Sequence, residues 1–325
     1  MKHDQPVLGI LLMLGFCVVA PMGDAVAKLL GQEVPLGQLL LVRFLVQAVL
    51  LIPIVWATKL AWRMQGRVLR LVIVRTALHI IGIGAMFTAL QYLPLADAVA
   101  IAFVMPFIML LLGKFILNEE VGLRRVGACV VGFAGTLMVI QPSFVAVGWP
   151  ALLPLVVAIV FSLFMLTTRQ IAKDIDPISL QAVSGVMAVG FLLPLTLIGN
   201  AQGVSVLALI APNGYQLFLL AAIGLLGTVA HLLMTWSLRF APSATLAPMQ
   251  YLEIPVATFF GWLIFSDLPN GLAAAGICVT IAAGLYIILR ERAIAARSGA
   301  SSEPPTNSDA SAARSQATQV SPPPA

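Results

Sequence analysis

Runs of apolar residues, each about 20 residues long, follow one another along most of this chain, separated by short connections. A helix of about 20 apolar residues spans the hydrocarbon core of a bilayer. The sequence is 60% hydrophobic and 10% charged, whereas soluble domains contain about 25% charged residues. We therefore predict an all-α integral membrane protein whose solvent is largely the lipid bilayer. The ten predicted transmembrane helices are residues 7–27, 35–56, 71–91, 96–114, 124–140, 151–168, 178–198, 217–238, 244–265 and 271–289.

The two ends of the chain depart from this pattern. From Ser298 onward the composition changes to Ser, Ala, Pro, Gln and Thr. We predict a disordered cytoplasmic tail over residues 298–325, because it has too little apolar surface to fold. At the other end, Lys2, an apolar run and Ala25-Val26-Ala27 imitate a cleavable signal peptide. Asp24 and Pro21 disfavour that alternative, and the internal repeat requires the first helix.

The sequence contains an internal repeat of five predicted helices. Tyr92-Leu93-Pro94-Leu95-Ala96 aligns with Phe240-Ala241-Pro242-Ser243-Ala244. Five further residues align at one constant offset: Pro106, Gly122, Gly127, Cys129 and Gly135 with Pro255, Gly271, Gly276, Cys278 and Gly284. We predict one repeat over residues 7–140 and a second over residues 151–290.

An odd number of helices in each repeat gives the two repeats opposite orientations, and the loop charges agree. The loop after the second predicted helix carries Lys59, Arg63, Arg67 and Arg70, whereas its counterpart, residues 199–216, has no Lys or Arg. Cationic loops stay cytoplasmic, so we predict a multi-pass protein of the inner membrane with both termini in the cytoplasm. Inverted repeats recur in secondary transporters, whose substrate site lies near the midplane between the repeats.

Ionisable side chains inside the predicted helices mark the candidate site, because each costs about 2.5–3.5 kcal/mol on insertion scales. Glu253, His231, His79 and Arg43 lie close to the middle of their helices, and Arg75 lies one turn before His79. We predict that Glu253 binds substrate or couples transport. Alternatives remain open for the others. Arg43 is also suited to pair with Glu253 or with free carbonyls, Arg75 to snorkel to the cytoplasmic surface, and the histidines to link helices by hydrogen bonds.

Two polar stripes are predicted to face one another across a midplane cavity. His79 aligns with Gly227, one helical turn from His231, so the repeat places the two histidines on equivalent faces. The aromatic residues Tyr251 and Trp236 are further candidates for substrate binding. One stripe is Thr228, His231 and Thr235, and the other is Gln250, Glu253 and Ala257.

Pro106 and Pro255 occupy equivalent positions in the two repeats. A proline inside a helix removes a backbone hydrogen bond and kinks the helix. The symmetric pair favours a shared role as hinges, and a static kink in each helix is the alternative.

The sequence contains no motif of a known enzyme class: no His-Glu-x-x-His, no Gly-x-Ser-x-Gly and no Walker loop. Cys17, Cys129 and Cys278 lack the clustered spacing of a zinc site or a disulfide framework. We therefore predict no enzymatic activity, no metal and no cofactor. The net charge of +5 arises from Lys and Arg in short loops, so nucleic acid is not an expected partner.

Several motifs are typical of one transporter superfamily. They are Tyr92-Leu93-Pro94-Leu95-Ala96-Asp97-Ala98, Leu117-Asn118-Glu119-Glu120, Tyr251-Leu252-Glu253-Ile254-Pro255 and Gly261-Trp262-Leu263-Ile264-Phe265-Ser266-Asp267. Over about residues 7–290 the chain resembles the drug/metabolite transporter superfamily, specifically proteins with two EamA domains. Asp267 stands where that family usually has Glu. Gly23-Asp24-Ala25-Val26-Ala27-Lys28 resembles a branch that contains S-adenosylmethionine uptake carriers and riboflavin transporters.

The resemblance implies a central cavity lined by both halves, and alternating access. We expect a secondary transporter, as a monomer or homodimer, for a small-molecule substrate such as riboflavin, S-adenosylmethionine or an amino acid. The alternative is a non-transporting membrane sensor or an intramembrane enzyme. A sensor should carry a signalling domain, and an intramembrane enzyme should show paired acids or a Ser/His set. Substrate, direction of transport and coupling ion stay open.

Overall fold

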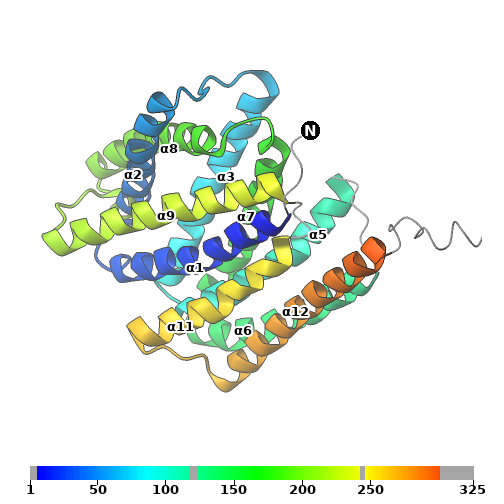
Figure 1. Cartoon of the computed structure of the whole chain (residues 1–325). Coiled ribbons are helices and arrows are strands. Elements are labelled where there is room, and N and C mark those ends of the chain that lie inside the picture. Colours follow the sequence, from blue (N-terminus) through cyan, green and yellow to red (C-terminus); the bar gives the residue numbers. More distant parts are fainter. Residues whose placement is uncertain (1–5, 117–122, 242–245, 301–325) are drawn as a thin grey trace, which may run out of the picture. The chain divides into compact units, whose positions relative to one another are not determined.

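The computed structural model describes residues 6–116, 123–241 and 246–300, and these residues form only helices and connecting loops (Figure 1). Among the described residues, those up to Ile287 belong to one compact unit and residues 288–300 to a second. The motif at 117–120 and residues 301–325 of the predicted tail lie outside the described residues. Residues 298–300, which were predicted to begin the disordered tail, are instead the last residues of the helix Gly271–Ala300, so the predicted start of the tail is wrong. The first helices are α1 (Pro6–Leu30), α2 (Leu36–Ala57), α3 (Gly66–Leu90), α4 (Leu95–Ala102), α5 (Met105–Ile116) and α6 (Leu123–Val147). The later helices are η1 (Trp149–Leu152), α7 (Leu153–Ile171), α8 (Pro177–Ala201), η2 (Ser205–Leu207), α9 (Gly214–Phe240), η3 (Ala247–Leu252), α11 (Glu253–Phe265) and α12 (Gly271–Ala300).

Most of these helices match a bilayer in length and composition. Within the described residues, seven helical segments are long and apolar enough to cross a membrane. Shorter apolar helical segments cover Leu95–Met109, Met249–Phe265 and Gly271–Ala283. The all-helical fold class is confirmed for this part of the chain, and each predicted transmembrane helix overlaps one or two observed helices. The long segments are Val7–Leu30, Leu36–Ala57, Gly66–Leu90, Val130–Val147, Trp149–Ile171, Pro177–Ala201 and Gly214–Phe240.

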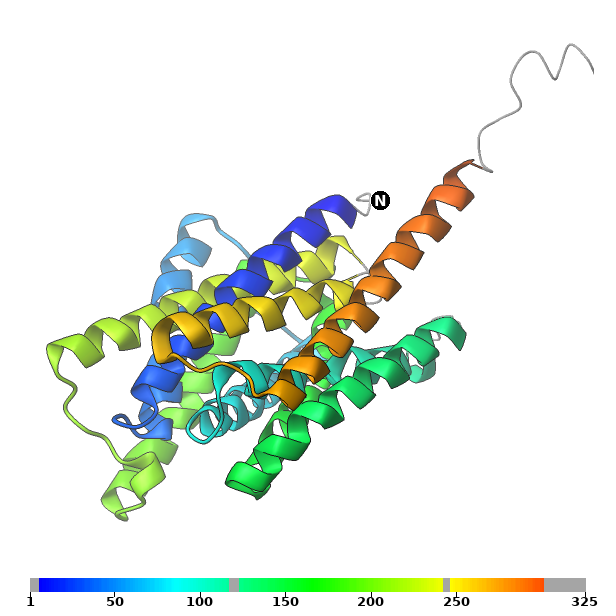
Figure 2. The ribbon, with the colours of Figure 1, turned by 90° about the horizontal axis from the view of Figure 1, so that it is seen from below.

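Helix α1 packs against helices from both halves of the chain. It lies along α9, which runs in the opposite direction (Figure 1), and Figure 2 shows α11 beside it from another side. The other close pairs are α3 with α7 and α2 with α8. If α1, α2 and α3 of the first half correspond to α7, α8 and α9 of the second, the contact equivalent to α1–α9 is α7–α3. Both contacts are observed. Two repeats related by a two-fold axis would produce this pattern.

Glycines allow some of these helices to approach closely. A Cβ atom on Gly224 of α9 would lie 2.4 Å from Cβ of Val46 in α2. A Cβ atom on Gly276 of α12 would lie 2.5 Å from the carbonyl oxygen of Gly135 in α6. Any larger residue at either position would force the two backbones apart.

Two of the predicted helices are divided rather than continuous. The predicted helix 96–114 ends at Ala102 and resumes as α5 at Met105. The described part of the predicted helix 244–265 contains η3 followed by α11. Pro106 and Pro255 each lie within the first three residues of the second piece. Proline has no N–H group to donate to the carbonyl four residues earlier. The α-helical hydrogen-bond pattern is therefore interrupted just before each proline.

An ion pair joins the ends of α1 and α11. Nζ of Lys28 lies 2.9 Å from Oδ2 of Asp267, which follows α11. Lys28 also donates to the carbonyl of Leu93, between α3 and α4, at 3.1 Å, and its Nζ lies 4.8 Å from the ring centroid of Phe265. One side chain therefore holds three segments together at this end of the bundle. The family usually has Glu where this chain has Asp267. Aspartate is also acidic, so the ion pair with Lys28 is still formed.

Candidate functional site

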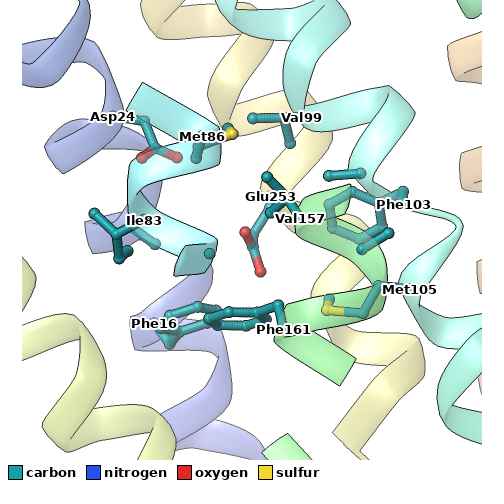
Figure 3. A pocket seen from close by; sticks show the side chains of 14 residues that line it. Phe16, Asp24, Ile83, Met86, Val99, Phe103, Met105, Val157, Phe161 and Glu253 are labelled. Atoms are coloured by element: carbon teal, nitrogen blue, oxygen red, sulfur yellow. The ribbon is translucent and has the colours of Figure 1, made fainter. Parts of the chain in front are cut away.

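A cavity of about 90 Å³ lies among α1, α3, α4, α7 and α11, close to both helix interruptions. Figure 3 shows its side chains converging on one space. The wall is mainly aromatic and aliphatic, and it contains two carboxylates, Asp24 and Glu253. The lining residues are Phe16, Ala20, Asp24, Gly82, Ile83, Met86, Val99, Ala102, Phe103, Met105, Val157, Ala158, Phe161 and Glu253.

Glu253 is the first residue of α11, and its carboxylate points into the cavity in Figure 3. Its Oε1 atom is buried and has no hydrogen-bond partner among the described residues. A buried carboxylate without a partner is costly, and the interruption of the helix at this residue places it beside the cavity. The position agrees with the role predicted from the sequence, and that role itself stays a prediction.

Asp24 is the acidic residue that sequence analysis missed. It lies in α1 and lines the same cavity as Glu253. It also lines a smaller cavity of about 30 Å³, to which Arg43 of α2 contributes. The sequence did contain a signal, because Asp24 is an acidic residue inside a predicted transmembrane helix. In the sequence analysis, Asp24 serves as evidence against a cleaved signal peptide and as part of the Gly23–Lys28 motif, and it is not assigned to the site.

Arg43, His79 and His231 form one buried cluster, in which the exposed fraction of each residue is 5% or less. Nη2 of Arg43 lies 3.1 Å from Nδ1 of His231 and 3.5 Å from Nε2 of His79. The two imidazole rings lie 4.2 Å apart. The structure therefore brings together the two histidines that the repeat placed on equivalent faces.

The contacts of this cluster constrain the two histidines differently. A guanidinium group can only donate, so Nε2 of His79 accepts from Arg43 and the proton of that ring lies on Nδ1. Nδ1 of His231 lies 3.1 Å from Nη2 of Arg43, a donor, and 3.0 Å from the carbonyl oxygen of Gly227, an acceptor, so these two contacts require opposite tautomers. Nδ1 of His79, Nε2 of His231 and Nη1 of Arg43 have no hydrogen-bond partner within the described part of the chain. The cluster thus keeps three unused polar atoms in the interior of the bundle.

Gly227 makes room for this cluster. A Cβ atom at Gly227 would lie 2.8 Å from Nε of Arg43. The guanidinium group also lies over the ring of Phe44, 4.8 Å from its centroid. No ion pair joins Arg43 to Glu253 or to Asp24 in the described residues. The alternative that Arg43 pairs directly with Glu253 is therefore wrong, because the guanidinium of Arg43 contacts the two histidines instead.

Arg75 is completely buried and does not reach the cytoplasmic surface. Its Nε donates to Oγ1 of Thr168 at 2.8 Å, and its Nη1 donates to Oγ of Ser184 at 2.9 Å. The guanidinium also lies 4.5 Å from the ring centroid of Phe164. Arg75 therefore joins α3 to α7 and α8, and the snorkelling alternative is wrong because polar partners are available inside the bundle.

The two predicted polar stripes do not face one another across a shared cavity. Thr228 donates to the carbonyl of Gly224 in its own helix, and Thr235 donates to the carbonyl of His231. Gln250 contacts Sδ of Met165 at 3.4 Å. The stripe prediction is wrong because α1 packs between its two helices: it contacts both α9 and α11, and its Phe16 lines the Glu253 cavity while lying 6.2 Å from the His231 ring.

The aromatic candidates also lie outside the cavity wall. Tyr251 is buried behind it, with its ring 5.4 Å from that of Phe103, which does line the cavity. Trp236 is half-buried in α9 and is not among the lining residues. The aromatic side chains that face the cavity are Phe16, Phe103 and Phe161, which sequence analysis did not single out because phenylalanines are common in apolar helices.

A model of the EamA-like transporter family matches residues 7–141 and 148–290 of this chain. The chain belongs to this family. The resemblance to EamA-domain proteins of the drug/metabolite transporter superfamily is therefore confirmed. Together with its apolar helices, this membership identifies a multi-pass membrane protein.

Relatives of this EamA-like protein include riboflavin transporters and S-adenosylmethionine uptake transporters. A riboflavin transporter of Rhizobium johnstonii is 30% identical over 217 residues, which cover 67% of this chain and 69% of the relative. An S-adenosylmethionine uptake transporter of Rickettsia prowazekii is 24% identical over 276 residues, covering 85% of this chain and 90% of the relative. A crystal structure with 16% sequence identity matches with a TM-score of 0.63 and covers 90% of this chain and 99% of its own. At that identity the similarity concerns the fold.

Proposed function

We propose that this protein is a secondary transporter that moves a small organic metabolite across the inner membrane by alternating access. The observation that carries the proposal is the cavity between α1, α3, α4, α7 and α11, with two carboxylates in an otherwise apolar wall. Acidic side chains inside a membrane protein are rare and mark substrate or ion pathways. The relatives named as riboflavin and S-adenosylmethionine transporters support a metabolite as the substrate.

The proposed architecture is ten transmembrane helices in two inverted repeats with both termini in the cytoplasm. In this orientation Lys28, Leu93 and Asp267 lie at the outer face, where their contacts hold α1, the α3–α4 connection and the end of α11 together. We propose that these contacts close the outer side of the bundle in this state, as alternating access requires. The helix interruptions at α4–α5 and η3–α11 border the cavity and provide places where the two halves flex.

Membership in a transporter family favours transport over the alternatives of a membrane sensor or an intramembrane enzyme. Asp24 and Glu253 line one cavity and so provide the paired acids expected of an intramembrane enzyme. We assign these acids to binding, because the wall around them is aromatic and aliphatic and offers no further polar group for catalysis among its lining residues.

Counterflow in proteoliposomes tests the proposal without knowledge of the coupling ion. Liposomes containing the purified full-length protein are loaded with an unlabelled compound and diluted into a trace of the same compound in labelled form. Riboflavin, S-adenosylmethionine and a set of amino acids form the panel. We expect transient accumulation of at least one labelled compound above protein-free liposomes, because a carrier exchanges substrate across the membrane. Absence of counterflow for the whole panel, in protein that is correctly inserted, would contradict the assignment.

A further inference from the structure

The cavity wall contains acidic side chains and no basic side chain to balance them. Asp24 and Glu253 contribute acidic groups, and the other lining residues are Phe, Met, Val, Ala, Ile and Gly. Within the described residues, no Lys or Arg lies in ion-pair contact with either carboxylate. Oε1 of Glu253 is buried and lacks any hydrogen-bond partner there. A carboxylate in such surroundings is stabilised by a cation that enters the cavity or by a proton.

Arg43 does not remove this imbalance at Glu253. It faces the smaller cavity that Asp24 also lines, so its positive charge acts first on Asp24. Its Nη2 atom is directed at the two histidines, at 3.1 Å and 3.5 Å. Glu253 is not among the residues that line the Arg43 cavity. A positively charged group of a ligand is therefore stabilised most where it contacts the carboxylate of Glu253 and also lies close to that of Asp24.

The opposite part of the wall suits the faces of rings and apolar groups. The rings of Phe16 and Phe161 are nearly parallel, with an angle of 14° between them and centroids 6.3 Å apart. Figure 3 shows these two rings side by side below the Glu253 carboxylate, with Phe103 at the side. Aromatic faces attract cations as well as planar groups. The same space thus offers an anionic side and an aromatic side.

We propose that this cavity selects organic cations: molecules in which a positively charged nitrogen or sulfur is attached to a planar or apolar body. The charge lies between Asp24 and Glu253, and the body packs on Phe16, Phe161 and Phe103. This inference rests on the proposed transport function and specifies its substrate class. S-adenosylmethionine, with its sulfonium group, belongs to this class, and uncharged riboflavin does not.

Matched pairs of compounds that differ by one positive charge test the inference. S-adenosylmethionine differs from S-adenosylhomocysteine by the methyl group that creates the sulfonium, and 1-methylnicotinamide differs from nicotinamide in the same way at nitrogen. Binding of each compound and of riboflavin to the purified full-length protein is measured by isothermal titration calorimetry. We expect the charged member of at least one pair to bind about tenfold more tightly than its neutral partner.

Two variants locate the effect, and one variant serves as a matched control. Glu253→Gln and Asp24→Asn are each expected to reduce the preference for the charged member to about threefold or less. Asp97→Asn changes another buried acid, which accepts a hydrogen bond from Ser143 at 2.9 Å and lies outside the cavity wall. It should retain the preference. If a variant fails to fold, the ratio of the affinities of the unchanged protein for the charged and the neutral compound still tests the inference.

The results separate this inference from the transport proposal. Equal binding within both pairs, tighter binding of the neutral members or of riboflavin, or no binding of either cation would overturn cation selection. Counterflow of riboflavin or of another compound without a positive charge would then leave transport standing. A preference that survives both Glu253→Gln and Asp24→Asn would also overturn the inference, because the charge would then be recognised elsewhere.

Discussion

At the scale of single residues, the interior of this protein separates two kinds of charge. Asp24 and Glu253 face a cavity, whereas Arg43 and Arg75 are enclosed by side chains that hold them in place. Arg75 has two hydroxyl partners and Arg43 has two imidazole partners. Buried arginines with such partners stabilise contacts between helices, while an acidic group beside a cavity is available to a ligand.

Replacing Glu253 by glutamine is the most informative single change. Glu253→Gln preserves the size of the side chain and removes its charge, so we expect normal expression and an unchanged elution volume. Substrate counterflow should fall at least about tenfold, which corresponds to roughly 1.4 kcal/mol. The measurement is the initial rate of counterflow in proteoliposomes with equal amounts of protein.

Arg43 supplies the control for this prediction. If Glu253 and Arg43 acted as a structural pair, the double variant Arg43→Gln with Glu253→Gln would recover much of the loss. We expect no recovery, because Arg43 is bonded to His79 and His231 rather than to Glu253. Wild-type counterflow in Glu253→Gln would show that the carboxylate is incidental.

At the scale of helices, the two interruptions set the position of the site. Ala102 and Phe103, at the end of α4, and Glu253, at the start of α11, all line the cavity. An uninterrupted helix would present backbone groups already bonded within the helix, with side chains spaced at 3.6 residues per turn. The breaks before Pro106 and Pro255 instead allow each helix to change direction beside the cavity.

Alanine at Pro255 tests the proposed hinge. Pro255→Ala restores a backbone N–H that can bond to the carbonyl of Tyr251, so the helix should become more continuous and the protein equally or more stable. We expect the transport rate to fall about fivefold or more while substrate binding changes less than about twofold, because a stiffer helix slows exchange between conformations. Rates come from counterflow and affinities from calorimetry.

Pro194 provides the matched control for the hinge. It is an exposed proline inside α8, a helix that continues past it without interruption. Pro194→Ala should leave the transport rate close to that of the unchanged protein. If Pro255→Ala also transports at the normal rate, the interruption is a static feature of packing, as the alternative interpretation holds.

At the scale of the whole molecule, the contacts between helices are consistent with two equivalent halves. The α1–α9 contact is equivalent to the α7–α3 contact when the helices of the two halves are matched in order. Each of the two matches to the EamA-like family model covers about one half of the chain. The loop charges add that equivalent loops lie on opposite sides of the membrane. The combination predicts inverted repeats.

Topology reporters test this arrangement directly. Fusions of a reporter that is active only in the cytoplasm are made after Arg63, between α2 and α3, and after Asn213, before α9. We expect activity after Arg63 and none after Asn213, because the first loop is cationic and its counterpart carries no Lys or Arg. A periplasmic reporter at the same two positions is the control. The same side for both positions would rule out the inverted repeat.

The approximate positions of the helices could be predicted from the sequence because they depend on local runs of apolar residues, and the family could be predicted from short motifs. In lipid, each membrane-spanning segment must satisfy its own backbone hydrogen bonds. A run of about 20 apolar residues therefore predicts a helix, whatever the rest of the chain contains. Glu253 could be singled out for the same reason, because it is an acidic residue inside such an apolar run. Pro106 and Pro255 likewise predict a kink in each helix, but the sequence does not show that each helix divides into two pieces at these places.

Which side chains meet was settled by packing between distant segments. Asp24 and Glu253 reach one cavity only because α1 lies between α9 and α11, and Arg43 contacts two histidines on α3 and α9 because Gly227 leaves it room. No local pattern encodes such encounters, since the apolar faces of these helices are similar in composition and many pairings would bury them equally well. Shape complementarity among all the helices selects one pairing, and it decides which polar groups find partners and which remain open to a substrate.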